Sequence, residues 1–185
     1  MQPHDAVSEE ESKWYVLRDL KRANSKTPAY KVLGELGFEI FTPMHWVLKS
    51  ISTGGKKREY VPVIHGLLFV KSLRPKLEPV IDKTDTLQFR FMKGMQKTPM
   101  TVPANEMERF IRAVTSEHAS CVYYSPEDIK PEMLGKKVVV VGGSMDGMVG
   151  NLLKHRGTKK KRLVLQLKDT LVASVEITDG YIQFI

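Results

Sequence analysis

Residues 62–70 read Pro-Val-Ile-His-Gly-Leu-Leu-Phe-Val, and this nearly continuous apolar run decides the first half of the fold. A strand with apolar side chains on both faces belongs inside a sheet, so Val63–Val70 is expected at its centre. Two aromatic and β-branched segments, Trp14–Leu17 and Phe38–Phe41, precede the run, and Leu87–Met92 follows it. These segments predict a mainly antiparallel sheet.

Helices alternate with these strands. Thr27-Pro28 is a typical helix start, with Pro at the first helical position, and apolar residues of 29–36 follow at helical spacing until Gly37. Pro75–Ile81 predicts a short helix, and residues 103–114 predict a long one with a single apolar face. The fold class expected for this half is α+β, an α/β sandwich with helices on the sheet.

A polar hairpin interrupts the sandwich. His45–Ile51 and Lys56–Val61 are expected to form two extended arms, joined by a turn at Ser52–Gly55.

From Lys136 the pattern becomes all β. The residues Val139, Val141, Gly143, Gly147 and Gly150 are spaced as strand, turn and strand. Glycine permits positive φ in a tight turn, and Gly150 would let another strand approach closely. No Gly-Lys-Ser/Thr follows the glycines, which excludes a phosphate-binding loop. Five short strands predict a small SH3-like β-barrel: Lys137–Val141, Met148–Leu153, Arg162–Leu167, Leu171–Ile177 and Tyr181–Ile185.

The distribution of charge supports two domains. The net charge is +8, which favours anionic partners such as nucleic acid. Residues 13–112 and 131–185 are both basic, whereas residues 113–130 between them are slightly acidic. We therefore predict a disordered acidic tail at 1–12, an N-terminal domain at 13–114, a linker at 115–130 and the barrel domain at 131–185.

Several function classes are not expected. The single cysteine, Cys121, allows no intrachain disulfide, and the five histidines are not spaced as metal ligands. No signal peptide, membrane-length apolar run or catalytic motif is found, so we expect a cytoplasmic protein that is not an enzyme and needs no cofactor or metal.

The ordered set of motifs resembles the NusG family of transcription elongation factors over residues 13–185. The residues that carry the resemblance are the Trp14-Tyr15 strand, Phe41-Thr42-Pro43, the run at 62–70 and the C-terminal glycines followed by Val172–Glu176. The C-terminal part is similar to the family's KOW barrel. Thr101-Val102-Pro103 with Met107–Arg112 is similar to the UpxY-type antiterminators of capsular polysaccharide operons.

The resemblance implies a docking patch for RNA polymerase. In the family, apolar side chains of the N-terminal sheet pack on the clamp helices of the largest polymerase subunit. Leu67, where the family often has Tyr, and Phe69 match this patch, with Trp14, Phe41 and Phe89 as expected neighbours. The alternative is that these side chains only fill the core.

Three basic clusters are candidate nucleic-acid contacts. Residues Lys21, Arg22 and Lys26 match a region that can touch the non-template DNA strand in specialised family members. The hairpin bases Lys56, Lys57 and Arg58 could face upstream DNA or another polymerase element. In the barrel, Arg156, Lys159, Lys160, Lys161 and Arg162 could contact RNA or the ribosome. Each cluster could instead be a solvated surface.

The resulting hypothesis is a monomeric factor that binds the polymerase clamp, recognises non-template DNA or nascent leader RNA, and promotes processive antitermination at specific capsular or exopolysaccharide operons. Its KOW domain could bind a ribosomal protein or a termination factor. Two alternatives remain, a general NusG-like elongation or termination factor and a ribosome- or RNA-binding KOW protein.

Overall fold

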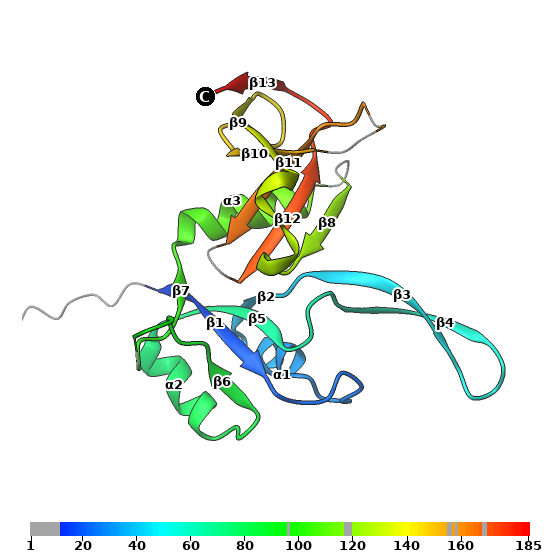
Figure 1. The fold of residues 1–185 in the computed structure, drawn as a ribbon. Coiled ribbons are helices and arrows are strands. Elements are labelled where there is room, and N and C mark those ends of the chain that lie inside the picture. The colour runs from blue at the N-terminus through cyan, green and yellow to red at the C-terminus, as the bar shows by residue number, and fades with distance from the viewer. Residues whose placement is uncertain (1–11, 96, 117–119, 155–156, 158, 168–169) are drawn as a thin grey trace, which may run out of the picture. The chain divides into compact units, whose positions relative to one another are not determined.

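The computed structural model describes residues 12–95, 97–116, 120–154, 157, 159–167 and 170–185 (Figure 1). The predicted tail at 1–12 lies outside the described residues except for Ser12. The chain divides into two compact units. One holds the described residues up to Thr42 together with His65–Thr101, and the other holds Pro43–Ile64 together with Val102–Ile185.

Five strands of the described residues form the N-terminal sheet: β1 (Lys13–Asp19), β2 (Glu39–Phe41), β5 (Leu67–Ser72), β6 (Leu87–Phe89) and β7 (Thr101–Val102). Their order is β2-β5-β1-β6, and β7 also pairs with β1. The two central strands, β1 and β5, are antiparallel and place Val16 opposite Phe69. The predicted antiparallel sheet with β5 at its centre is therefore confirmed.

The central strand starts later than its sequence predicts. Residues 63–66 form a bend and turn, and β5 begins at Leu67, not at Val63. Gly66 explains the difference because its φ is +74°, which is incompatible with a strand. A Cβ at Gly66 would lie 2.4 Å from the backbone oxygen of Asp19. The close approach of these two backbones therefore requires glycine.

Two helices, α1 (Ala29–Glu35) and α2 (Arg74–Asp82), pack on one face of the N-terminal sheet. Gly37 follows α1 with a φ of +80°, as expected of a helix stop. Pro28 is the N-cap of α1 and not its first helical residue. The buried core between these helices and the sheet consists of Tyr15, Leu17, Ala29, Leu33, Leu68, Val70, Leu77, Ile81 and Leu87.

The predicted hairpin is present and is formed by β3 (Met44–Ser50) and β4 (Lys56–Pro62). The strands pair in continuous antiparallel register from Met44–Pro62 to Ser50–Lys56. Figure 1 shows them as a long twisted ribbon. Most of its side chains are exposed.

The C-terminal sheet is antiparallel, with the order β13-β9-β10-β11-β12-β8. The predicted glycine turn is confirmed, because the φ of Gly143 is +72° and that of Gly147 is +73°. A Cβ at Gly150 would lie 2.4 Å from the carbonyl oxygen of Val164, so this glycine admits the neighbouring strand as predicted. The strands are β8 (Cys121–Tyr124), β9 (Leu134–Val141), β10 (Val149–Leu153), β11 (Arg162–Leu167), β12 (Leu171–Glu176) and β13 (Tyr181–Phe184).

The predicted linker at 115–130 differs from the structure. It contains β8, which pairs with β12, and a 3-10 turn at Pro126–Asp128; another 3-10 turn follows at Pro131–Met133. The aromatic run Cys-Val-Tyr-Tyr carries the strand propensity that the periodicity argument missed.

The helix predicted at 103–114 is α3 (Ala104–Val114), preceded by Pro103 as its N-cap. It contacts β11 and β12, and its buried residues are Met107, Phe110 and Ala113. The structure therefore groups α3 and the hairpin with the C-terminal sheet, whereas the sequence placed both in the domain 13–114.

Candidate protein-docking face and basic surfaces

The two faces of the N-terminal sheet have different surroundings. Side chains alternate along a strand, and the register places Trp14, Val16, Phe41, Leu67 and Phe69 together on the face opposite α1 and α2. The rings of Phe41 and Phe69 are 6.1 Å apart between centroids. We call these five residues the docking face. Four of the five predicted docking residues are thereby brought together.

Phe89 is the exception. It pairs with Leu17, and its ring packs edge-on against Tyr15 with 5.6 Å between centroids. It therefore lies on the helix-covered face, and its prediction as a neighbour of Phe69 is wrong. The spacing of residues in sequence did not reveal which face this short edge strand presents.

The docking face is largely inaccessible to solvent in this structure. The exposed fractions of Trp14, Leu67 and Phe69 are 1%, 5% and 0%. The Nε1 atom of Trp14 has no hydrogen-bond acceptor among the described residues. A buried indole normally finds an acceptor, so this donor is left unsatisfied.

The first basic cluster is only partly available for contacts. The Lys21 ammonium donates to the carbonyl oxygen of Thr27 at 2.6 Å, which ties the loop before α1 together. Arg22 and Lys26 are exposed. The structure thus gives Lys21 a local role that sequence reasoning did not find.

The second basic cluster is at the tip of the hairpin. The side chains of Lys56, Lys57 and Arg58 are exposed and alternate between the two faces of the ribbon. Arg58 lies over the ring of Trp46, with its Cζ 4.5 Å from the ring centroid. Sequence reasoning missed Trp46 and its neighbour Tyr60. The spacing of these two residues, which places them opposite each other in an otherwise polar hairpin, could have indicated an exposed aromatic pair.

The basic side chains of the third cluster differ in whether they are held by contacts within the protein. Lys160 pairs with Glu176 at 2.9 Å. The Arg162 guanidinium donates to the hydroxyl of Ser174 at 3.0 Å and to the carbonyl oxygens of Ser174 and Ser120 at 2.6 and 2.9 Å. Arg162 therefore joins strands of the sheet and offers little to a partner. Lys159 and Lys161 are exposed, and Arg156 lies outside the described residues.

These exposed lysines border an open groove of about 630 Å³ on the C-terminal sheet. Tyr181 and Phe184 also line it, and their exposed fractions are 81% and 59%. Asp179 lies in sequence between the lining residues Thr178 and Gly180, and it accepts hydrogen bonds from the backbone N–H and hydroxyl of Ser144 at 2.9 and 3.1 Å. The Ser144 N–H is the main cause that lowers the pKa of this carboxyl.

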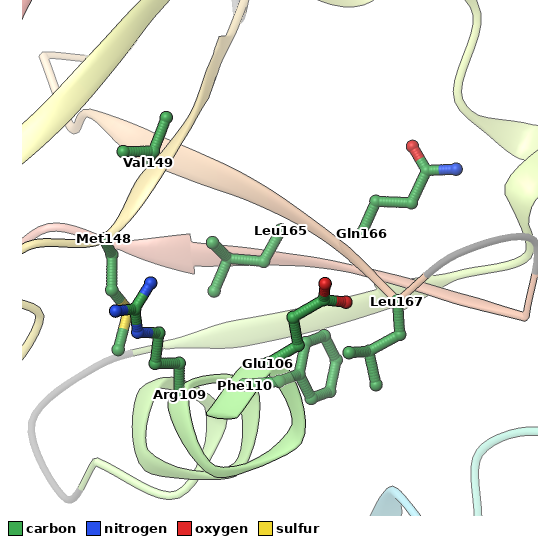
Figure 2. A pocket seen from close by; sticks show the side chains of 8 residues that line it. All are labelled: Glu106, Arg109, Phe110, Met148, Val149, Leu165, Gln166 and Leu167. Carbon is green, nitrogen blue, oxygen red and sulfur yellow. The ribbon is translucent and has the colours of Figure 1, made fainter. Parts of the chain in front are cut away.

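A smaller open pocket of about 180 Å³ lies between α3 and the strands β10 and β11 (Figure 2). Phe110, Leu167 and Met148 supply apolar lining, and Arg109 supplies a cationic side chain. This volume is below that of a typical small-molecule site. The remaining lining residues are Glu106, Val149, Leu165 and Gln166.

Cys121 has the properties of a structural thiol. Burial raises its pKa to about 11, against smaller opposing effects of the Tyr123 hydrogen bond and the Arg162 charge. Burial is likewise the main cause that raises the pKa of Tyr123. A thiol with such a pKa is protonated at neutral pH, which is the opposite of an activated nucleophile.

Two kinds of site are absent from the described part of the chain. It contains no group of three His, Cys, Asp or Glu side chains that could hold a metal ion. Within the same residues, no helix has the length and apolar character to cross a membrane.

Comparison with known proteins identifies the family. No curated protein matches the chain. Among nine matching chains of solved structures is one described as "Domain interaction in Thermotoga maritima NusG", with 14% identity, a TM-score of 0.44, and coverage of 91% of this chain and 98% of that one. The family model described as "Transcription termination factor nusG" matches residues 12–111. Because this match spans more than half of the sequence, the chain belongs to the NusG family of transcription factors.

Proposed function

We propose that this NusG-family protein binds the clamp helices of the largest RNA polymerase subunit and promotes processive antitermination at specific operons, of the capsular or exopolysaccharide type. The docking face supports this proposal, because its aromatic and aliphatic side chains lie together on one face of a sheet. Such a surface is suited to packing against a pair of helices. The protein acts in the cytoplasm as a monomer, by binding and not by catalysis.

Docking through this face requires a change of conformation. Phe69 and Trp14 are buried in the present structure, so a partner reaches them only after the face becomes accessible. A polymerase that binds the open form shifts the equilibrium toward it. The unsatisfied Trp14 Nε1 favours binding of a partner to the open form, because the partner can supply the missing hydrogen-bond acceptor.

The proposed mechanism is differential binding. A factor bound across the clamp helices holds the clamp closed on the DNA–RNA hybrid, which disfavours pausing and termination. The C-terminal sheet, proposed as a KOW domain, recruits a second partner through the groove between Lys159, Lys161, Tyr181 and Phe184. Tethering raises the local concentration of that partner.

The test is transcription by purified elongation complexes through an intrinsic terminator, with and without the protein. Templates carrying a capsular-operon leader are compared with unrelated leaders. The proposal expects more read-through on the specific template only. Equal read-through on all templates would favour the general factor, and unchanged termination on every template would contradict antitermination.

A further inference from the structure

The hairpin of β3 and β4 exposes two aromatic rings to solvent. Trp46 and Tyr60 are directly paired across the strands, with 4.9 Å between ring centroids and an angle of 40° between ring planes. Their exposed fractions are 56% and 50%. The neighbouring Leu48 is 70% exposed. The pair thus forms an apolar platform about half of whose surface is exposed to solvent.

The two faces of this ribbon differ in acidic charge. By alternation, the face with Trp46 and Tyr60 also carries Arg58 and Lys56 but no acidic side chain, as all residues of both strands are described. The single acid of the two strands, Glu59, lies on the opposite face and pairs with Lys49 at 2.7 Å. We call the first face the aromatic face; its members are Met44, Trp46, Leu48, Ser50, Lys56, Arg58, Tyr60 and Pro62.

We propose that the aromatic face binds a single-stranded polynucleotide. Unpaired bases stack on aromatic rings, and Arg and Lys contact the adjoining phosphates. Arg58 covers the Trp46 ring in the free protein at 4.5 Å from its centroid. An exposed cation–π contact of this kind is weak, so Arg58 exchanges the indole for a phosphate while a base takes its place.

The same chemistry selects against a duplex. In double-stranded DNA the faces of the bases are stacked within the helix, so Trp46 and Tyr60 would contact only the backbone. DNA and RNA share base faces and phosphates, and the aromatic face therefore binds both single-stranded DNA and single-stranded RNA. This inference concerns the hairpin alone and does not depend on docking to polymerase.

The first experiment measures fluorescence anisotropy of labelled oligothymidine and oligouridine of about 12 nucleotides, within the range of known single-strand sites. Trp46→Ala is expected to weaken binding of both by at least about fivefold, because stacking on one ring has that effect. Trp46→Phe keeps a ring and is expected to retain most of the affinity. A duplex of the same length is expected to bind more weakly than either single strand.

Lys56 and Lys57 provide a matched pair of controls. They are adjacent, exposed and equally charged, but they project from opposite faces of the ribbon. Lys56→Gln is expected to weaken binding severalfold and to lower its salt dependence, whereas Lys57→Gln is expected to change both less. Circular dichroism of each variant establishes that it is folded.

Intrinsic fluorescence reports on stacking itself. The chain has two tryptophans, and Trp14 is buried whereas Trp46 is exposed. Oligothymidine is expected to quench emission in the wild type and in Lys57→Gln, and to leave emission of Trp46→Phe unchanged. Absence of binding by the wild type, a preference for duplex, unchanged affinity of Trp46→Ala, or equal losses in Lys56→Gln and Lys57→Gln would each overturn the proposal.

Discussion

Leu67 and Leu68 are consecutive residues of β5 that lie on opposite faces of the N-terminal sheet. Leu68 belongs to the core beneath α1 and α2, whereas Leu67 belongs to the docking face. Both are nearly inaccessible, with exposed fractions of 2% and 5%. The two side chains have the same size and similar burial, and differ in what they can offer to a partner.

Truncation of either leucine is expected to reduce stability to a similar degree. Leu67→Ala and Leu68→Ala each remove buried methyl groups and leave a cavity, which costs about 2–5 kcal/mol. Urea unfolding followed by circular dichroism measures the free energy of unfolding of each. A loss below about 1 kcal/mol for Leu67→Ala alone would show that the docking face is exposed in solution.

Asp19 is expected to stabilise the start of α1. Its carboxylate accepts hydrogen bonds from the backbone N–H of Ala29 at 2.7 Å and of Lys21 at 3.0 Å. The N-cap Pro28 supplies no side-chain hydrogen bond, so Asp19 performs the capping from β1. Asp19→Ala should lower the free energy of unfolding by about 1–3 kcal/mol. The exposed Asp85 is a control whose replacement by Ala should have little effect.

The C-terminal glycines should differ in their tolerance of alanine. A Cβ at Gly150 would meet the backbone of Val164, whereas nothing lies within 4 Å of one at Gly147, where only the positive φ opposes substitution. Gly150→Ala is expected to cost about 3 kcal/mol and Gly147→Ala about 1 kcal/mol. Thermal unfolding of the two variants gives the comparison, and an equal loss would contradict the close approach of β10 and β11.

Cys121 should react slowly in the folded protein with reagents that alkylate thiolates. Raising its pKa from 9.0 to about 11 reduces the thiolate fraction at pH 8 by about 100-fold. Alkylation by iodoacetamide, followed by mass spectrometry, is expected to be slow in buffer and fast in urea. Because the unfolded thiol ionises first, this group also makes the fold less stable as pH rises between about 9 and 11.

Most of the elements could be predicted because their signals are local. The continuous apolar run of β1, the glycine after α1 and the positive-φ turn at Gly143 each depend on a few neighbouring residues. The start of β5 could not be predicted, because it depends on the contact of Gly66 with Asp19, which is distant in sequence. The linker prediction missed β8 for another reason, because it relied on the lack of periodicity and overlooked the local strand propensity of this aromatic segment, which pairs with β12.

The candidate surfaces were predictable by residue type but not by face. Four residues of the docking face were expected from the family resemblance, but the side of the sheet on which Phe89 lies could be assigned only from the register of β6. Likewise, Arg162 is a cation like the lysines that precede it, and only its hydrogen bonds to Ser120 and Ser174 distinguish it from the exposed Lys159 and Lys161.

Leu67 and Leu68 also provide a matched pair for measuring whether the docking face binds the polymerase clamp. Binding of wild type, Leu67→Ala and Leu68→Ala to RNA polymerase is measured by biolayer interferometry, at a temperature where all three are folded by circular dichroism. If the docking face binds the clamp, Leu67→Ala is expected to lose at least about tenfold in affinity, as an interface anchor does, while Leu68→Ala is expected to bind as the wild type does. Equal affinities for the two variants would contradict this role of the docking face.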